Sequence, residues 1–247
     1  MESIFQYGKH ETDYLASRDR QLAEVIEKIG HVRRSVDTDL YSAVVHHIVA
    51  QQISTKAQQT VWRRFGEALG EITPRAVAAA GRERLQALGM TFRKAEYILD
   101  FSAKVLSGEC DLAAIGRMPD AEAIAALSAL KGIGVWTAEM ILLFCLQRPD
   151  ILSYGDLAIQ RGMRMVYRHR VLTPELFERH RRRLSPCGSI ASLYFWAVAG
   201  GAIPSLTDPG MRTTALSPSK RRGDGAKRDA GEHKAGKNAR HDDFPSR

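Results

Sequence analysis

The most informative segment of this 247-residue chain reads Leu130-Lys131-Gly132-Ile133-Gly134-Val135-Trp136-Thr137-Ala138. Its two glycines stand between a helical pattern capped by Asp120 and an apolar helical pattern over residues 136–146. Glycine lets the backbone turn sharply and approach a ligand closely. The second helix therefore begins with free N–H groups that point out of the turn, and such a helix end binds anions, including a DNA phosphate. A single acid, Asp156, stands 20 positions after Trp136.

Apolar residues recur at helical spacing along almost the whole chain, and no run alternates in the manner of a strand. Glycine, proline, serine and threonine mark the helix ends, with Ser54 and Thr91 as expected N-caps. The pattern predicts an all-α fold. The expected helices cover residues 22–29, 41–52, 55–69, 74 onward, 82–88, 92 onward, 120–127, 136–146, 156–166, 174–184 and 190–199.

The charge balance is basic. The chain carries a formal net charge of +8, from 36 Lys and Arg against 28 Asp and Glu, which favours a polyanionic partner. Much of the surplus lies after residue 210. Residues 205–247 are rich in Gly, Ser, Pro and charged side chains and nearly free of large apolar ones, a composition typical of disorder. We interpret them as a disordered basic tail that either adds non-specific DNA affinity or is a solvated extension without function.

The three cysteines, Cys110, Cys145 and Cys187, are widely spaced and form neither a metal-ligand pattern nor a disulfide framework. This usage suits a reducing cytoplasm. The first residues lack the apolar core of a signal peptide, and no apolar run approaches membrane-spanning length. The sequence thus predicts a soluble cytoplasmic protein without a membrane partner, associated with the nucleoid if its source is bacterial.

The hairpin and Asp156 together resemble the helix-hairpin-helix (HhH-GPD) superfamily of DNA glycosylases, and within it the alkylpurine branch, the 3-methyladenine DNA glycosylase II type. The resemblance extends over about residues 40–196. It implies two helical subdomains with a cleft between them. The expected glycosylase domain covers residues 1–204, with one lobe of about residues 40–130 and the other of residues 1–39 and 131–204.

The resemblance places the catalytic carboxylate at Asp156. Breaking an N-glycosidic bond builds positive charge on the sugar, which a fixed, ionised carboxylate stabilises while it orients or deprotonates the attacking water. A base that is already cationic, such as an N3- or N7-alkylated purine, leaves as a neutral molecule and needs no general acid. One carboxylate therefore suffices for cationic purines.

Two features of related enzymes are missing from this sequence. Superfamily members that also cut the strand have a lysine nucleophile at the position of Trp136, and an indole cannot form their Schiff base. Lys131 is nearby, but it lies inside the turn. Other members hold an iron–sulfur cluster with four closely spaced cysteines, a pattern that this chain lacks. We therefore expect a glycosylase without lyase activity, without an organic cofactor and without an iron–sulfur cluster.

A target base must leave the DNA stack to reach such a carboxylate. The resemblance implies that Trp136 and Trp196 face the extruded base, and an indole face attracts a cationic purine with about 0.5–2 kcal/mol. Tyr154 is a further candidate for this pocket. The competing interpretation is that both tryptophans pack in the core, as large helical aromatics usually do. Trp62, on an amphipathic helix, is assigned to the core.

Gln51 and Gln52 stand in the segment Val49-Ala50-Gln51-Gln52-Ile53-Ser54, which resembles the turn that superfamily members insert into the DNA minor groove. The resemblance implies that Gln52 fills the gap left by the flipped nucleotide. Gln51 either lines the base pocket or holds the turn. The alternative is that both amides satisfy local backbone groups.

Further DNA contacts are expected at the hairpin, where backbone N–H groups of the two glycines and Trp136 would hold a phosphate. The resemblance also implies a Na⁺ or K⁺ ion on backbone carbonyls of residues 130–135, without metal ligands from side chains. The hairpin residues expected to contact DNA are Lys131, Gly132, Gly134 and Thr137.

Three further features are less specific. The segment Pro186-Cys187-Gly188-Ser189-Ile190-Ala191 resembles the superfamily's Pro-x-Arg-Ser-x-Ala, but Gly188 replaces the arginine, and Ser189 suits a helix N-cap. His46 and His47 lack spaced acidic or cysteine partners, so we interpret them as structural. The basic run within residues 179–183 is typical of a solvated helical face.

These observations favour a monofunctional glycosylase that acts as a monomer on double-stranded DNA with damaged bases. It would release alkylated purines such as 3-methyladenine or 7-methylguanine and leave an abasic site for base excision repair. One alternative is a glycosylase for deaminated or oxidised bases. Another is a non-catalytic DNA-binding protein, against which Asp156 argues, because a carboxylate does not help to bind a polyanion.

Overall fold

Twelve α-helices make up the part of the chain that the computed structural model describes, residues 3–210. No β-strand is present in these residues, which confirms the predicted all-α class; Ile4 and Ser35 form an isolated antiparallel bridge. The helices are α1 (Lys9–Arg18), α2 (Arg20–Ile29), α3 (Leu40–Ala50), α4 (Thr55–Leu69), α5 (Pro74–Ala87), α6 (Phe92–Ser107), α7 (Leu112–Arg117), α8 (Asp120–Ser128), α9 (Val135–Phe144), α10 (Leu157–Tyr167), α11 (Pro174–Leu184) and α12 (Gly188–Ala199).

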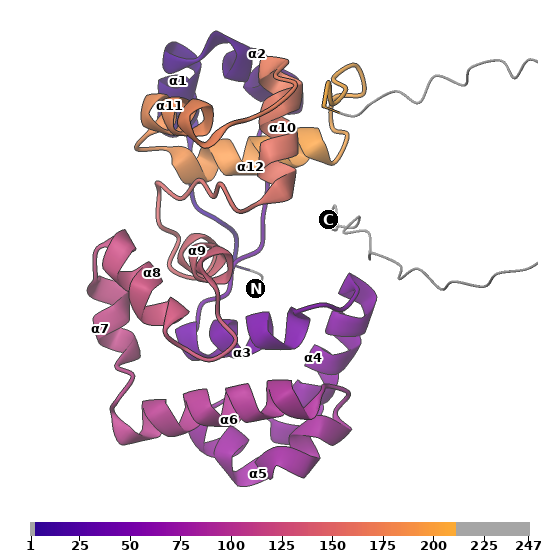
Figure 1. Ribbon diagram of the computed structural model, residues 1–247, viewed down its shortest axis with the longest axis vertical. Helices are drawn as coiled ribbons and strands as arrows, with labels where there is room; N and C mark the ends of the chain where they lie inside the picture. The colour runs from indigo at the N-terminus through magenta and orange to yellow at the C-terminus, as the bar shows by residue number, and fades with distance from the viewer. Residues whose placement is uncertain (1–2, 211–247) are drawn as a thin grey trace, which may run out of the picture.

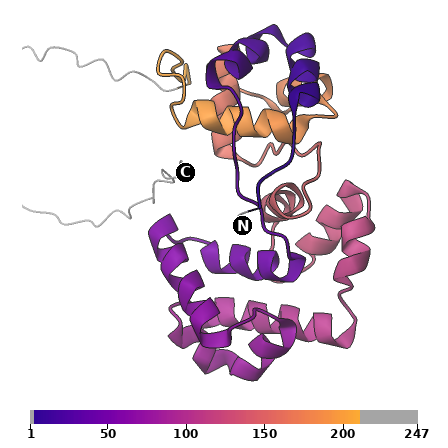
Figure 2. The same ribbon diagram turned by 180° about the vertical axis from the view of Figure 1, so that it is seen from behind.

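The helices form two lobes (Figure 1). The lower lobe contains α3 to α8, and the upper lobe contains α1, α2, α10, α11 and α12. Helix α9 lies between them and packs against α8 and α3. The extended segments 3–8 and 30–39 link the upper lobe to the middle of the molecule, as Figure 2 shows from behind. They are joined by hydrogen bonds, among them one of 2.8 Å from the Phe5 amide to the Arg34 carbonyl.

Side-chain caps fix the start of most helices. Ser54 accepts a hydrogen bond from the Ala57 amide at the start of α4, and Thr91 does the same for Lys94 at the start of α6. Both caps confirm the sequence prediction. Asp120, in contrast, is the first residue of α8 rather than its cap, because Pro119 occupies the N-cap position.

Two helices were not predicted, α1 and the short α7, because neither has a wide apolar stripe. The helices predicted from residues 74 and 82 form a single element, α5, with a break at Gly81, where φ is +72°. The predicted tail also begins too early, since Asp208 forms a 2.5 Å ion pair with Arg164 and its side chain is only 3% exposed. Residues 205–210 thus belong to the folded body, whereas the rest of the predicted tail, 211–247, lies outside the described residues.

Helices α10 and α12 make the closest helix contact that bears on the site. A Cβ atom added at Gly162 would lie 2.1 Å from the Phe195 carbonyl oxygen, so only glycine permits this separation of the two backbones. The N-terminus of α10 holds Asp156 and α12 holds Trp196. The close packing of the two helices therefore sets the distance between these two residues.

The loop before α10 is fastened to the first turn of α12. The Ser189 hydroxyl accepts a hydrogen bond from the Ile151 amide at 2.9 Å, and the Ser192 hydroxyl donates one to the Ile151 carbonyl at 2.9 Å. Ser189 therefore does not cap α12 as predicted; Cys187 occupies the N-cap position. The serine hydroxyls instead hold the loop that leads to Asp156.

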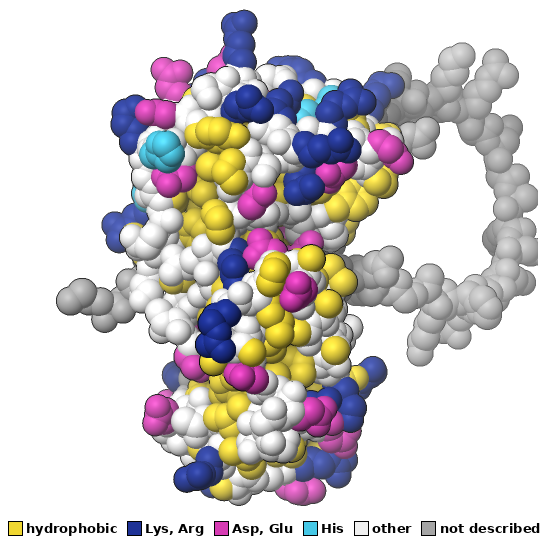
Figure 3. All heavy atoms as spheres, turned by 90° about the vertical axis from the view of Figure 1, so that its left-hand side faces the viewer, with side chains coloured by type: hydrophobic (Ala, Val, Ile, Leu, Met, Phe, Trp, Pro, Cys, Tyr) yellow, Lys and Arg dark blue, Asp and Glu magenta, His cyan; other side chains and the backbone are white. Residues whose placement is uncertain are grey.

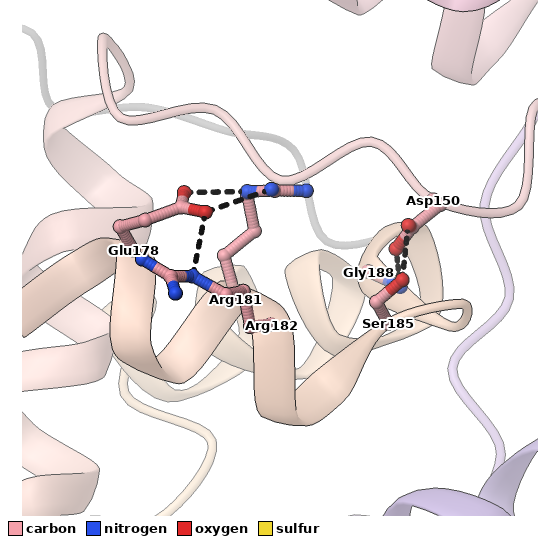
Figure 4. A network of polar contacts seen from close by, with 6 residues as sticks. All are labelled: Asp150, Glu178, Arg181, Arg182, Ser185 and Gly188. Carbon is pink, nitrogen blue, oxygen red and sulfur yellow. Dashed lines mark hydrogen bonds and ion pairs between the residues drawn. The ribbon is translucent and has the colours of Figure 1, made fainter.

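Asp150 adds a second fastening between this loop and α12 (Figure 4). Its carboxylate accepts hydrogen bonds from the Ser185 hydroxyl at 2.6 Å and from the Gly188 amide at 3.0 Å. A Cβ at Gly188 would lie 2.7 Å from the Asp150 carboxylate, so the carboxylate fills the space that a side chain would need. This contact gives a local structural reason for glycine where the superfamily motif has arginine.

The basic run on α11 is largely paired with acids. Arg181 and Arg182 both bind the Glu178 carboxylate (Figure 4), and Arg183 forms a 2.5 Å ion pair with the buried Asp19. The hydrogen bond from Arg181 is the main cause that lowers the pKa of Glu178 to about 2. Figure 3 shows Lys and Arg side chains over the upper lobe with acidic side chains among them. The run is therefore a mixed-charge face.

Candidate active site

The hairpin between α8 and α9 has the sharp turn expected from its glycines. Gly132 has a φ of +84°, a conformation that disfavours any side chain. The Tyr97 ring of α6 supports the turn from below, because a Cβ at Gly132 would lie 2.4 Å from it. Gly134 occupies the N-cap position of α9 and makes no side-chain cap, so the first N–H groups of this helix have no capping oxygen within residues 3–210.

The turn between α3 and α4 is tied to the hairpin. The Gln51 side-chain amide donates a 2.6 Å hydrogen bond to the Gly132 carbonyl, so Gln51 holds the turn, one of the two roles expected for it. From α6, the Lys94 ammonium donates to the carbonyls of Val49 and Gln51 at 2.9 and 2.5 Å. Partial burial lowers the pKa of this lysine.

Gln52 is the exposed tip of this turn. It has a φ of +57°, which is uncommon for a residue other than glycine, asparagine or aspartate and costs about 1 kcal/mol or more. The contacts of Gln51 and Lys94 hold the chain in this conformation. A strained, exposed glutamine beside the hairpin is consistent with the predicted insertion of Gln52 into DNA.

Asp156 is buried, with 4% of its surface exposed, and it accepts four N–H donors. Its Oδ1 caps α10 by accepting from the amides of Ala158 and Ile159, each at 2.9 Å, and also accepts from the Trp196 indole at 3.2 Å. Among the described residues, its Oδ2 accepts only from the Trp136 indole, at 2.9 Å. Because each carboxylate oxygen has two lone pairs, Oδ2 keeps one acceptor site for a ligand.

The two tryptophans that hold Asp156 differ in exposure. Trp136, in the first turn of α9, is 40% exposed. Trp196, on α12, is 8% exposed, and its ring stacks on Phe144 at 5.4 Å. The structure thus brings together three of the predicted site residues, with Trp196 as a buried support and Trp136 at the surface.

A second carboxyl group, Glu139, lies near Asp156 and was missed by the sequence analysis. It is one turn from Trp136 on α9 and accepts a hydrogen bond from the buried Ser153 hydroxyl. Burial raises the pKa of Glu139. The hydrogen bond from Ser153 lowers this pKa and the negative charge of Asp156 raises it, and the net result is a raised pKa. The i, i+3 spacing of Trp136 and Glu139 was the available signal, since it places both on one helix face.

Glu139 and Trp136 hold the same loop at two points. Trp136 bonds Asp156 directly, whereas Glu139 bonds Ser153, whose carbonyl accepts from the Asp156 amide at 3.4 Å. Gly155 lies beside both contacts, because a Cβ added there would be 3.7 Å from the Ser153 hydroxyl and 3.7 Å from Trp136 Cβ. Helix α9 therefore fixes both the hairpin and the acid.

The other predicted site residues have partners or surroundings of their own. Tyr154 packs edge-on against Phe177 at 5.1 Å and donates to the Leu172 carbonyl at 3.3 Å. Lys131 forms a 2.6 Å ion pair with Asp100. Thr137 is buried, with 7% exposure, and its predicted phosphate contact stays a prediction.

Backbone carbonyls of the hairpin are the candidate ligands for a monovalent cation. The Gly132 carbonyl accepts from Gln51, and the Leu130 carbonyl accepts from the Ile133 amide at 3.1 Å. Each carbonyl oxygen has a second lone pair, and the monovalent ion on residues 130–135 stays a prediction. Within residues 3–210 no cluster of His, Cys, Asp or Glu could hold a metal ion.

His46 and His47 are engaged inside the protein. The His46 ring packs at a tilt against Trp62, with ring centroids 4.4 Å apart, and contacts Asp37 and Gln58. Burial lowers the pKa of His47 to about 4. Trp62 is half-buried and packs on Phe65 as well as His46, rather than lying fully in the core as predicted.

A family model described as "HhH-GPD superfamily base excision DNA repair protein" matches residues 45–187. The matched segment contains the α3–α4 turn, the hairpin and Asp156. The chain belongs to this superfamily. No helix within residues 3–210 of this HhH-GPD protein has the length and apolar character needed to cross a bilayer.

Similar HhH-GPD proteins are known by sequence and structure. DNA-3-methyladenine glycosylase 1 of Schizosaccharomyces pombe is 27% identical over 74% of this chain and 84% of its own length. The crystal structure of a DNA-3-methyladenine glycosidase from Bacillus halodurans superposes with a TM-score of 0.71 and 32% identity, covering 80% of this chain and 93% of that one. The S. pombe 3-methyladenine DNA glycosylase in complex with abasic DNA gives a TM-score of 0.68 at 25% identity, covering 77% and 97%.

Proposed function

We propose that this protein is a monofunctional DNA glycosylase that excises alkylated purines and leaves an abasic site in base excision repair. The observation that carries the proposal is the buried carboxylate of Asp156, held by two indole N–H groups beside a helix-hairpin-helix turn. Similar proteins are DNA-3-methyladenine glycosylases, which supports alkylated bases as the substrate class.

Asp156 would stabilise the sugar as the glycosidic bond breaks. Oδ1 is occupied by two backbone amides and Trp196, so it fixes the carboxylate. Oδ2 has the remaining lone pair, and this oxygen would face C1′ of the deoxyribose or the attacking water. A preorganised charge at the place where positive charge develops is the kind of arrangement that contributes most to catalysis.

Trp136 would contact the extruded base, since it is the more exposed of the two tryptophans and borders the acid. A cationic purine that stacks on the indole gains a cation–π attraction, which an undamaged, neutral base lacks. Such a base departs as a neutral molecule, so no proton donor is needed. Charge and the weakened glycosidic bond together would select the lesion.

A lyase reaction does not fit the residues near the sugar. Trp136 lies at the position where bifunctional relatives have their lysine, and it has no amine to form a Schiff base. Lys131 is held by Asp100 at 2.6 Å. The reaction we propose is therefore hydrolysis alone.

The hairpin would grip the DNA strand that carries the lesion. The uncapped N–H groups at the start of α9 fit a phosphate, and a monovalent cation on the hairpin carbonyls would supply positive charge next to that phosphate. Gln52 would enter the minor groove and fill the gap of the flipped nucleotide. We further propose that the enzyme acts as a monomer on double-stranded DNA, in the cytoplasm at the nucleoid if the source is bacterial.

A panel of duplexes with defined lesions tests this function. Wild-type protein should release 3-methyladenine or 7-methylguanine, identified by mass, and leave alkali-labile abasic sites without cutting the strand itself. Release of uracil, hypoxanthine or 8-oxoguanine instead would favour the glycosylase for deaminated or oxidised bases. Tight DNA binding without release of any base would favour the non-catalytic binding protein.

A further inference from the structure

We propose that a basic groove beside the α3–α4 turn binds the sugar–phosphate backbone of the DNA strand opposite the damaged base. This inference rests on the proposed glycosylase function. The groove has a volume of about 380 Å³ and runs along α4 to the turn between α5 and α6. The residues that matter to the argument are Ser54, Lys56, Thr60, Arg64 and Gly89.

The charged side chains that line the groove, Lys56 and Arg64, are both cations. Lys56, Thr60 and Arg64 recur every four residues, so they form one row along α4. No acidic side chain of the described chain lines the groove. Lys56 forms no ion pair with any acid of residues 3–210, and Arg64 makes a long hydrogen bond, of 3.4 Å, to the Leu88 carbonyl. The Thr60 hydroxyl donates to the Lys56 carbonyl at 2.9 Å, so the two exposed cations carry the argument. Two cations in one row suit a chain of phosphates rather than an acidic protein surface that offers isolated carboxylates.

Gly89 keeps the groove open at its far end. Its φ of +114° excludes most side chains, and an added Cβ would lie 3.3 Å from both the Arg64 guanidinium and the Val61 side chain. The absence of a side chain leaves the guanidinium accessible from the groove. At this end the groove is therefore bordered by backbone without a side chain, which leaves room for a DNA strand.

The position of the groove relative to the hairpin identifies the strand. Gln51 bonds the hairpin at Gly132, Ser54 lines the groove, and the exposed Gln52 stands between them in the same turn. The minor groove of B-DNA is bordered by its two strands. If the hairpin holds the strand with the lesion and Gln52 enters the minor groove, the groove along α4 meets the other strand.

The first experiment measures the salt dependence of DNA binding. The probe is a duplex with a tetrahydrofuran abasic analogue, titrated at ionic strengths from about 50 to 200 mM with wild type, the double variant Lys56→Gln/Arg64→Gln and the control Arg63→Gln. Arg63 is the neighbouring cation on α4, but it pairs with Glu67 at 2.5 Å and does not line the groove. The double variant should bind about 10-fold more weakly, and its slope of log K against log salt should fall by about 0.9 for each phosphate that the variant no longer neutralises. The control should match wild type.

The second experiment assigns the strand. Methylphosphonate linkages, which have no charge, are placed either in the strand with the abasic analogue or in the opposite strand. Wild type should lose affinity with both duplexes, whereas the double variant should lose affinity only when the damaged strand is neutralised. Binding to the damaged strand alone, as a single strand, should be the same for both proteins.

The inference would be overturned if the double variant had the same salt slope as wild type. It would also be overturned if neutralising the damaged strand no longer lowered the affinity of the double variant, while neutralising the opposite strand still did. Because the probe cannot be excised, these results do not depend on catalysis. Failure of wild type to release any base contradicts the proposed function alone. Normal excision by wild type together with a double variant equal to the control contradicts the inference alone.

Discussion

The carboxylate site around Asp156 and the turn around Gln52 lie near the same hairpin, yet they are built in opposite ways. Asp156 is buried and accepts four N–H donors without any DNA present. Gln52 is exposed, has a left-handed backbone and stands near Lys56, which has no acidic partner within residues 3–210. The difference indicates that the carboxylate of Asp156 is fixed before the substrate binds. Gln52 and Lys56, in contrast, would complete their contacts only with DNA.

Removing the charge of the Asp156 carboxylate should have the largest effect on the excision rate. Asp156→Asn keeps the size and one acceptor oxygen, but it loses the negative charge that would stabilise the sugar. We expect the single-turnover excision rate to fall by a factor of about 10³, equivalent to about 4 kcal/mol, with DNA affinity retained.

The control for this variant is Asp150→Asn. Asp150 lies in the same loop and holds Ser185 and Gly188 rather than the indoles. Its substitution should lower thermal stability more than the excision rate. Equal losses of rate in both variants would show that Asp156 has only a structural role, and the contrast drawn above would then disappear.

Gly162→Ala tests whether helix packing fixes the site. The Cβ of the new alanine would lie 2.1 Å from the Phe195 carbonyl oxygen. This distance is an overlap, so α10 and α12 must separate. We expect a loss of about 3 kcal/mol in the free energy of unfolding, measured by denaturant titration, with a lower excision rate in the molecules that remain folded. Gly66→Ala on α4 is the matched control, because apart from the neighbouring turns of its own helix no atom of the described residues would lie within 4 Å of the added Cβ. It should be neutral or stabilising by up to about 1 kcal/mol.

Trp136→Phe separates ring stacking from hydrogen bonding at the acid. Phenylalanine keeps an aromatic face for the base but removes the N–H donor to Oδ2. The excision rate should fall about 10-fold, equivalent to about 1.4 kcal/mol, while binding to abasic DNA changes little. Trp62→Phe, in the lower lobe, should leave the rate unchanged. A Trp136→Phe rate equal to wild type would mean that Asp156 does not depend on this donor.

The same contrast explains what the sequence could predict. The hairpin, the Ser54 and Thr91 caps and the all-α class depend on local preferences of a few neighbouring residues, and these were predicted. The bond from Gln51 to Gly132 joins residues 81 positions apart, and the bond from Trp196 to Asp156 joins residues 40 apart. No local pattern specifies such pairs, because they depend on how helices far apart in the sequence pack against one another within each lobe.

The roles of two acidic residues were not predicted, because each residue type is common in the local sequence around it. Glu139 is a single acid in an apolar helix, which is typical of a solvated position, although the structure bonds it to Ser153. Asp208 stands in a polar segment that has the composition of a tail, yet its ion pair with Arg164 fastens that segment to α10. In both cases a long-range polar partner, absent from the local sequence, decides the structure.

The smallest predicted effect concerns the charge of Glu139 and depends on pH. Burial and the charge of Asp156 raise the pKa of Glu139 in the folded protein, so ionisation of this group costs stability, and that cost appears as pH rises through the raised pKa. Glu139→Gln keeps an acceptor for Ser153 but cannot ionise. The variant should therefore melt about 1–2 °C above wild type at pH 8, with the difference vanishing below pH 4.5, the ordinary value for glutamate.

Ser153→Ala provides the counterpart, because it removes the hydrogen bond and leaves the charge. This variant should melt below wild type at pH 8, and its excision rate should fall a few-fold, since the loop that holds Asp156 loses one of its two attachments to α9. Glu139→Gln should keep most of the rate. If Glu139→Gln lost as much rate as Ser153→Ala, the charge of Glu139 would itself assist the reaction, and the fixed site would contain two working carboxylates instead of one.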